Sequence, residues 1–255
     1  MNIQFQRAVD RYVGVPICAL FSLVNRILPN NPDGTPPKKI LIILLSEMGS
    51  LVLAQPMIMR LKQLYPDASL HFLMFAKNRE VLDLLDVVPP ENVLTLNDKS
   101  LKGLVGDSLN AIRMMRKLKI GAVIDCELFA RISNIFSYLS GAPLRVGFHA
   151  HTQEGLYRGS FLSRPVMYNP YRHLTQQFLT LVSALESSTD PIAKLLPEPY
   201  TGKTPVLEFP PDELVHVRQE LHNFFPSIKD RKLVLIYPSG GILPIRAWPL
   251  KSYFQ

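Results

Sequence analysis

Carboxylate side chains follow two apolar runs of the sequence, and such groups can accept a proton from a substrate. Glu47 comes shortly after the run 40–45, and Asp125 and Glu127 close a second run that begins at Ala122. If both runs are strands of one parallel sheet, their ends share the edge at which ligands bind in such folds. These carboxylates therefore mark a candidate site for acid–base chemistry.

A second candidate site is a turn of small residues in the last part of the sequence. The apolar run 233–237 leads into Pro238 and then into Ser239, Gly240 and Gly241. Small residues at a strand end let backbone N–H groups approach phosphate oxygens, and the N-terminus of a following helix adds its dipole. The turn is a candidate phosphate site, and an ordinary strand-to-helix turn is the alternative.

The composition is typical of a folded domain with an anionic partner. Of 255 residues, 47% are hydrophobic and 19% charged, so the chain can bury a core. The net charge of +7 suggests nucleotide phosphates, acidic lipid or nucleic acid as the partner. Nucleic acid is the weakest choice, because the sequence has no binding module or aromatic–basic platform. Cys18 and Cys126 lack metal-ligand spacing, so we expect no metal site, no disulfide scaffold and a reducing compartment.

The elements that must position these groups alternate between apolar strands and amphipathic helices. This alternation predicts an α/β fold with a doubly wound, mostly parallel sheet of Rossmann type. Residues 149–170 break the rhythm, and we expect a long loop there. The expected strands are 40–45, 70–75, 93–96, 122–126 and 144–148, and the expected helices are 51–64, 79–85, 104–118, 131–139 and 171–185.

The last part of the sequence is expected to begin a second unit of the same kind, with a helix at 211–225 and a buried strand at 233–237. One strand and part of a helix cannot cover a sheet face, so we expect a fragment of a two-domain protein. The predicted division is an N-terminal arm with a linker (1–37), a Rossmann-like domain (38–200), and a linker with the incomplete start of a second Rossmann-like domain (201–255).

The N-terminal arm carries an uncharged run over 12–25, with Arg7 and Arg11 before it and Arg26 after it. The run is shorter than the roughly 20 apolar residues of a spanning helix, and no small-residue cleavage site follows it. We expect a helix that lies in a membrane interface with its arginines toward anionic headgroups. A core or domain-docking helix is the alternative.

Several nucleotide-binding and catalytic motifs are absent from the sequence. The turn after the first expected strand has one glycine, Gly49, in place of the G-x-G-x-x-G of dinucleotide-binding folds. The sequence also lacks a Walker A motif, a G-x-S-x-G elbow and an H-E-x-x-H pair. We therefore expect neither an NAD or FAD enzyme nor a P-loop NTPase.

Five stretches occur in an order and spacing that match a known enzyme family. They are ILIILLSEMGSLVLAQP at 40–56, KQLYPDA at 62–68, the D-x-x-x-x-x-R and S-G-A-P-x-R-V-G patterns of 122–147, the helix after His173, and the P-S-G-G with R-A-W-P of 237–249. In this order they resemble the family 9 glycosyltransferases, which include the ADP-heptose:lipopolysaccharide heptosyltransferases. The resemblance implies a GT-B fold, in which two Rossmann-like domains face each other across a cleft.

The resemblance also implies where the two substrates bind. The N-terminal domain would hold the acceptor, and the C-terminal domain would hold the nucleotide sugar at Ser239, Gly240 and Gly241. Arg246 lies where the family usually has lysine, and either cation can neutralise a diphosphate leaving group.

Basic side chains are frequent in the second half of the expected N-terminal domain, among them Arg158, Arg164, Arg172 and His173. A phosphorylated or acidic lipid-linked acceptor would explain them, and so would a solvated surface. The residues selected as acceptor-binding are Gly49, Arg131, Arg145, His149 and His151.

The catalytic base is the point at which the sequence departs from the family. The family's S-x-x-G-D loop carries an aspartate thought to be the general base, and Ser50 occupies that position here. A serine hydroxyl cannot take a proton at neutral pH, so Glu47 is the first choice as base. Asp125 and Glu127 are the other candidates, and capping of the following helix is the alternative role for Glu47.

The resemblance implies an inverting, metal-independent glycosyltransferase that moves a sugar, expected to be heptose, from a nucleotide diphosphate such as ADP-heptose. The acceptor would be the lipopolysaccharide core or another lipid-linked cell-envelope glycan, and no cofactor is expected. We expect the protein in the cytoplasm, attached peripherally to the inner face of the bacterial membrane. The alternative is a non-catalytic, membrane-associated relative that binds a nucleotide sugar or glycan and has lost its base.

Overall fold

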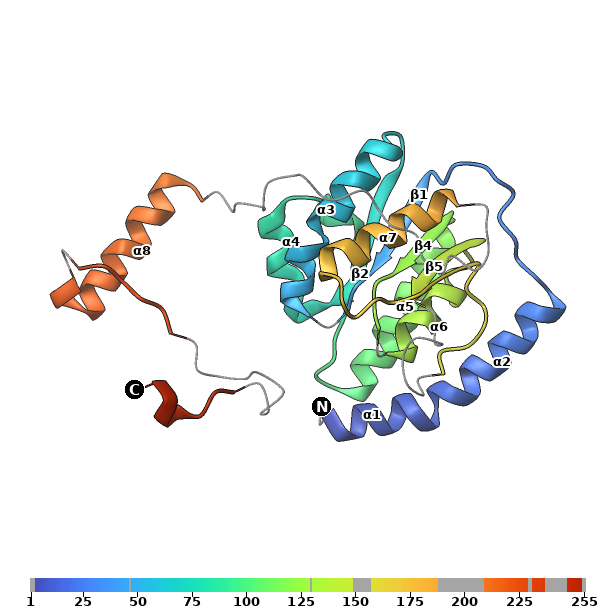
Figure 1. Cartoon of the computed structure of the whole chain (residues 1–255), viewed down its shortest axis with the longest axis horizontal. Coiled ribbons are helices and arrows are strands. Elements are labelled where there is room, and N and C mark those ends of the chain that lie inside the picture. The colour runs from blue at the N-terminus through green and yellow to red at the C-terminus, as the bar shows by residue number, and fades with distance from the viewer. Residues whose placement is uncertain are drawn as a thin grey trace. The chain divides into compact units, whose positions relative to one another are not determined.

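The computed structural model describes residues 3–45, 47–128, 130–148, 157–187, 209–228, 231–236 and 247–253. Its contacts group the chain into two compact units, Met1–Pro205 and Val206–Gln255. The arm expected at 1–37 therefore belongs to the same unit as the Rossmann-like domain. Figure 1 labels the helices and strands.

A six-stranded sheet forms the centre of the first unit. Its strands lie in the order β3-β2-β1-β4-β5-β6, and each neighbouring pair is parallel. This is the strand order of a Rossmann fold, so the predicted doubly wound α/β class is confirmed. The strands are β1 (Lys39–Ile43), β2 (Ser69–Phe75), β3 (Val93–Leu96), β4 (Ala122–Asp125), β5 (Leu144–Phe148) and β6 (Arg164–Val166).

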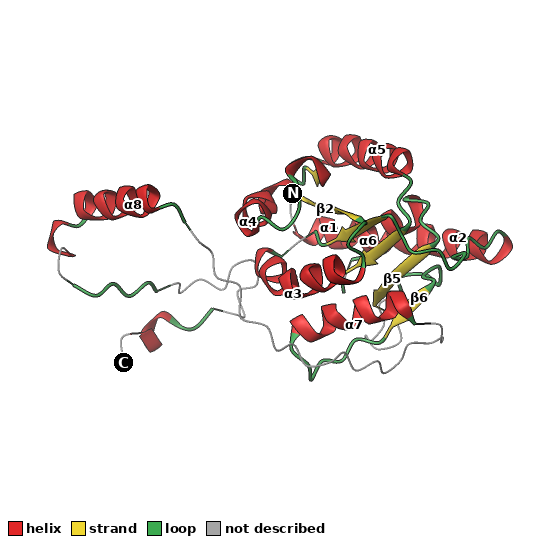
Figure 2. Ribbon diagram, turned by 90° about the horizontal axis from the view of Figure 1, so that it is seen from above, coloured by secondary structure: helices red, strands yellow, loops and turns green. Residues whose placement is uncertain are grey.

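Helices cover both faces of the sheet, and Figure 2 shows α3 and α7 on one side of the strands and α5 on the other. Side chains of β1 alternate between the two resulting cores, with Ile40 and Ile42 in one and Leu41 and Ile43 in the other. Covering on both faces explains the continuous apolar run of this strand. The helices of the first face are α3 (Met48–Leu64), α4 (Arg79–Leu85) and α7 (Leu174–Glu186), and those of the second are α5 (Leu101–Leu118) and α6 (Arg131–Leu139).

Two further helices, α1 (Ile3–Tyr12) and α2 (Gly14–Ile27), precede the sheet. They follow one another along one side of the first unit, drawn in blue in Figure 1. α2 packs against α6, where the ring of Phe21 stacks on that of Tyr138 with 4.7 Å between centroids. The N-terminal arm is thus docked on the domain.

The structure corrects one prediction within 149–170, where a long loop was expected. The described residues of this segment include β6, which pairs with β5 at the edge of the sheet. β6 has three residues, Arg164, Pro165 and Val166, which is too few to show the alternation that marks a strand in a sequence.

The strand predicted at 233–237 is also corrected over its described part. Residues 233–236 lie outside any strand, and their side chains are 54–80% exposed. A buried strand needs a hydrogen-bonding neighbour, and the described residues of the second unit provide none. Those residues form α8 (Pro211–Phe224) and two 3-10 turns, Pro226–Ile228 and Leu250–Tyr253.

Candidate functional site

The strand order of the sheet reverses between β1 and β4. In open α/β sheets, ligands bind beyond the carboxyl ends of the strands at this point. Ile43, the last residue of β1, is level with Asp125, the last residue of β4. The segments that carry Glu47 and Glu127 therefore leave the same edge of the sheet from adjacent strands, as the sequence predicted.

A chain of hydrogen bonds fixes the end of β1. The Leu45 N–H donates to Glu127 Oε1 at 2.6 Å, and Asn78 Nδ2 donates to the Leu45 carbonyl at 2.8 Å. Both side chains are buried, with 8% of Glu127 and 2% of Asn78 exposed. Glu127, a candidate base, thus holds the backbone that leads to Glu47. The sequence analysis missed Asn78, whose only signal is its position just beyond the end of β2.

The loop after β1 leaves Glu47 exposed at the start of α3. Glu47 Oε2 accepts a hydrogen bond of 3.1 Å from the hydroxyl of Ser50, which is itself buried. At Gly49, no described atom other than those of its chain neighbours and of its own helix backbone lies within 4 Å of the point that a Cβ would occupy. An accessible carboxylate, a hydroxyl and an uncrowded glycine therefore lie within one helical turn.

The first N–H groups of α3 also belong to this turn. Glu47 occupies the N-cap position, but its side chain makes no capping hydrogen bond. The alternative role that the sequence suggested for Glu47, capping of α3, is therefore not observed as a side-chain hydrogen bond. Uncapped N–H groups and the positive end of the helix dipole favour anionic or polar ligands.

Asp125, another candidate for the catalytic base, has a different environment. It is fully buried, and its carboxylate forms an ion pair with Arg158. It also accepts hydrogen bonds of 3.1 Å from the Glu127 N–H and from the Ser133 hydroxyl. Burial raises the pKa of Asp125, and Arg158 together with these hydrogen bonds opposes the rise. The geometry does not support a catalytic role, because no substrate reaches an enclosed carboxylate whose two oxygens are bound.

Arg158 connects the ends of several elements. In addition to Asp125, its guanidinium binds the carbonyls of Glu127 at 2.7 Å and Ala130 at 3.1 Å. The sequence analysis noted Arg158 only as one of many basic residues. Its carboxylate partner is 33 positions away in the sequence, and no spacing indicates such a pair.

Arg131, predicted to bind the acceptor, contacts the N-terminal arm instead. Its guanidinium pairs with Asp10 of α1 at 2.6 Å and donates to the Tyr157 carbonyl at 2.7 Å. The Arg131 N–H also donates to Asp10, at 2.8 Å. The side chain is 8% exposed, and these contacts favour a structural role.

Arg145, a second predicted acceptor residue, is 2% exposed. Its guanidinium donates to the Phe161 carbonyl at 2.8 Å and to Asn25 Oδ1 of α2 at 3.0 Å. Arg145 is level with Val123, two residues before the carboxyl end of β4, so it does not lie at the edge that carries Glu47. Its contacts likewise favour a structural role.

The structure thus brings together Glu47, Gly49 and Ser50 among the predicted site residues. Within the described ranges, no group of three or more His, Cys, Asp or Glu side chains could hold a metal ion. The remaining predicted residues lie outside the described part of the chain, and their roles stay predictions: His149, His151, Ser239, Gly240, Gly241 and Arg246.

No protein-family model and no curated protein sequence matches the chain. Solved structures match it in fold. The E. coli ADP-heptose lps heptosyltransferase II is 17% identical with a TM-score of 0.55, covering 83% of this chain and 57% of its own. The glycosyl transferase family 9 protein from Veillonella parvula is 14% identical with a TM-score of 0.56, covering 88% and 60%. The E. coli heptosyltransferase WaaC with ADP is 14% identical with a TM-score of 0.50, covering 60% and 49%.

These comparisons establish the fold of the chain, which spans 49–60% of the length of these three structures. The Rossmann-like sheet and its helices are shared with proteins that carry glycosyltransferase names. The expected fold class therefore agrees with both the strand order and the structural neighbours.

Proposed function

We propose that the chain is part of a GT-B glycosyltransferase of the family 9 type, and that its first unit holds the acceptor. The proposal is supported by the fold shared with heptosyltransferase structures and by the motif order of the sequence. The donor is a nucleotide-diphosphate sugar, ADP-heptose or a close analogue. The acceptor is a lipopolysaccharide core or another lipid-linked glycan of the cell envelope.

The observation that carries this proposal is the accessible carboxylate at the start of α3. Among the three candidate bases, Glu47 is exposed, whereas Asp125 is 0% and Glu127 8% exposed. The hydrogen bond from Ser50 orients the Glu47 carboxylate, and the space at Gly49 lets an acceptor hydroxyl approach it. Glu47 is therefore assigned as the general base in place of the family aspartate.

The proposed reaction is a single displacement at the anomeric carbon of the donor sugar. The acceptor oxygen forms a bond to this carbon on the face opposite the diphosphate, so the configuration inverts. The hydroxyl proton passes to the Glu47 carboxylate, and the electron pair of the breaking C–O bond leaves with the diphosphate. Arg246 and the N–H groups near Gly240 would stabilise the departing charge without a metal ion.

Sugar transfer by the full-length protein tests this assignment, with ADP-heptose as donor and a lipid-linked glycan as acceptor. Glu47→Gln keeps the size of the side chain and removes its basicity, so we expect kcat to fall by about 10²–10⁴-fold while donor affinity is unchanged. The matched control is Glu80→Gln, which changes an exposed acid in the first turn of α4 and should leave kcat unchanged.

Two results would contradict the proposal. A Glu47→Gln protein with wild-type kcat would place the base elsewhere. A wild-type protein that binds the donor and transfers nothing would favour the non-catalytic relative, for which Ser50 in the aspartate position is the supporting observation. The expected independence from metal is tested in the same assay, where a chelator should not change the rate.

A further inference from the structure

α2 turns an apolar stripe away from the domain on which it packs. Leu20, Leu23 and Ile27 are 55%, 56% and 67% exposed, and Val13 just before the helix is 51% exposed. Steps of three, four and seven residues place these side chains on one face of a helix. A stripe of large aliphatic side chains is therefore presented to solvent.

The opposite face of α2 makes the contacts with the domain, through the Phe21 ring and through small and polar residues. Gly14 and Cys18 are buried, and a Cβ at Gly14 would lie 3.0 Å from Cδ of Arg131. The Ser22 hydroxyl accepts from the Ser160 N–H at 2.8 Å, and Asn25 Oδ1 accepts from Arg145. α2 therefore carries apolar side chains on both faces, and the domain covers only one of them.

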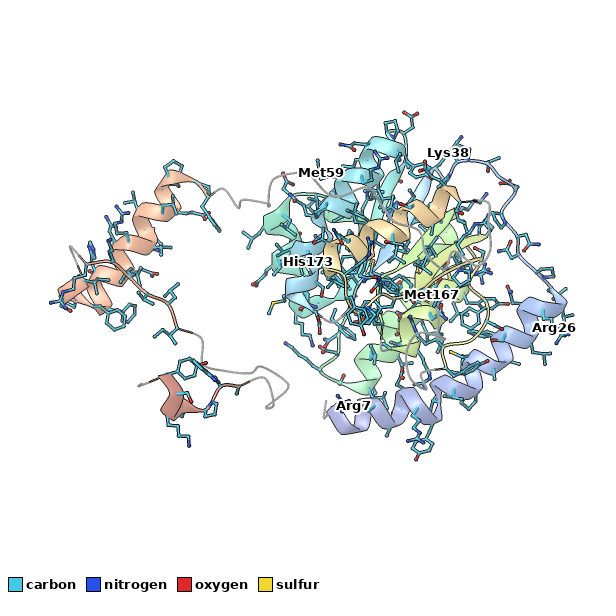
Figure 3. All side chains as sticks on the ribbon, viewed as in Figure 1. Arg7, Arg26, Lys38, Met59, Met167 and His173 are labelled. Carbon is cyan, nitrogen blue, oxygen red and sulfur yellow. The ribbon has the colours of Figure 1, made fainter. Side chains whose placement is uncertain are left out.

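The two helices that include the stripe also carry exposed positive charge. Arg7, Arg11 and Arg26 are exposed, and Figure 3 labels Arg7 on α1 and Arg26 near the end of α2. The only acidic residue between positions 3 and 28 is Asp10, which is paired with Arg131 of the domain. The helix pair therefore combines an apolar stripe with unneutralised arginines.

We propose that α1 and α2 bind the surface of an anionic bilayer and lie in its plane. Leu20, Leu23 and Ile27 would enter the boundary between headgroups and acyl chains, and the arginines would contact lipid phosphates. This inference does not depend on the proposed sugar transfer. If that transfer is also correct, the helix pair keeps the acceptor site beside its lipid-linked substrate.

The polar contacts favour this orientation over a membrane-spanning one. By length and composition, Arg7–Ile27 could cross a bilayer. Crossing would remove Asp10, Ser22 and Asn25 from their partners on the domain and leave them in hydrocarbon, which is costly for unpaired polar groups. Lying in the interface keeps every one of these contacts and buries only the stripe.

The charges also favour a bilayer over a second copy of the chain. Two copies that met through this stripe would bring their arginines to one interface, and the helix pair offers no unpaired carboxylate to neutralise them. Like charges at a protein interface oppose association. Anionic headgroups supply the missing negative charge.

Vesicle co-sedimentation of the whole chain tests the proposal, with phosphatidylglycerol–phosphatidylcholine vesicles and with phosphatidylcholine alone. We expect binding to the anionic vesicles and a loss of about tenfold or more in Leu20→Gln/Leu23→Gln, because two aliphatic side chains no longer enter the lipid. The matched control is Met59→Gln/Leu84→Gln, which changes two side chains of similar exposure, 44% and 53%, on α3 and α4 and should bind as wild type.

A second variant tests the charges separately. Arg7→Gln/Arg11→Gln/Arg26→Gln should lose about fivefold in binding per arginine on anionic vesicles, and far less at high salt. All substituted side chains are exposed, and equal melting temperatures by circular dichroism would verify that the variants fold.

Three results would overturn the inference. The first is that the wild-type chain binds neither vesicle, and the second is that the Leu20/Leu23 variant binds as well as the Met59/Leu84 control. Alternatively, light scattering would show a dimer that the Leu20/Leu23 variant converts to a monomer, without any vesicle binding by the wild type. That result would assign the stripe to a protein interface.

Discussion

The loop after β1 and the cluster around Asp125 lie at the same edge of the same sheet, yet their carboxylates have opposite environments. Glu47 is exposed and accepts a hydrogen bond from Ser50. Asp125 is enclosed and is bound by Arg158, by the Ser133 hydroxyl and by the Glu127 N–H. Both carboxylates follow an apolar run in the sequence. The difference shows that a position at the end of a strand does not by itself distinguish a candidate catalytic carboxylate from a structural one. The burial and the hydrogen-bond partners of the side chain do distinguish them.

The largest effect on stability should come from Asp125. In Asp125→Asn, the Arg158 guanidinium keeps its charge in a site that is 2% exposed and loses its counterion. Breaking a buried pair in this way costs about 3–5 kcal/mol of the free energy of unfolding, which urea denaturation measures.

Glu47→Gln is the control for this measurement, because the change is at an exposed side chain and should stay within about 0.5 kcal/mol of wild type. Equal stability of the two variants would remove the distinction between the enclosed cluster and the open loop.

Most of the first unit could be predicted from the sequence, because most of its strands are predominantly apolar runs and they alternate with helical segments. The predictions for 93–96, 131–139 and 144–148 coincide with β3, α6 and β5 to the residue. β6 could not be predicted, since three residues at a sheet edge carry no period. The predicted strand at 233–237 had the right composition, but composition does not supply the neighbour that a strand needs.

The candidate site was predictable in part. Glu47, Gly49 and Ser50 follow a recognisable strand end and lie within four consecutive positions, so the sequence itself groups them. Arg131 contacts Asp10, 121 positions away, and Arg145 contacts Asn25, 120 positions away. The charge of an arginine does not indicate such distant partners in the sequence. Burial, which decides whether an arginine binds a ligand or its own chain, is a property of the fold.

A smaller effect is expected at Arg145, where the structural and the ligand-binding roles give different results. Lysine keeps the charge but cannot reproduce the fork that holds the Phe161 carbonyl and Asn25. Arg145→Lys should therefore lose about 1–3 kcal/mol of the free energy of unfolding, by urea denaturation, through unsatisfied buried groups.

The control for Arg145 is Arg113→Lys, at an exposed position of α5, which should be neutral. If Arg145→Lys keeps wild-type stability and instead raises KM for the acceptor in the assay of the proposed sugar transfer, then Arg145 belongs to the substrate site and the contrast between the two regions is smaller than the contacts indicate.

A smaller change in stability than at Arg145 is expected at Gly49, and it should be a gain. Gly49 lies in the first turn of α3 without a positive φ, and no described atom crowds its Cβ position. Gly49→Ala should therefore raise the free energy of unfolding by about 0.4–1 kcal/mol, because alanine restricts the unfolded chain and suits a helix. Gly106→Ala, at an equally uncrowded position of α5, should give the same gain. In the proposed sugar transfer, however, the methyl group at position 49 would occupy the space beside Glu47. We therefore expect kcat/KM for the acceptor to fall about tenfold or more, whereas Gly106→Ala should leave it unchanged. A Gly49→Ala protein that is both more stable and fully active would mean that the acceptor does not approach Glu47 through this space. The loop after β1 would then no longer be supported as the catalytic region of this sheet edge.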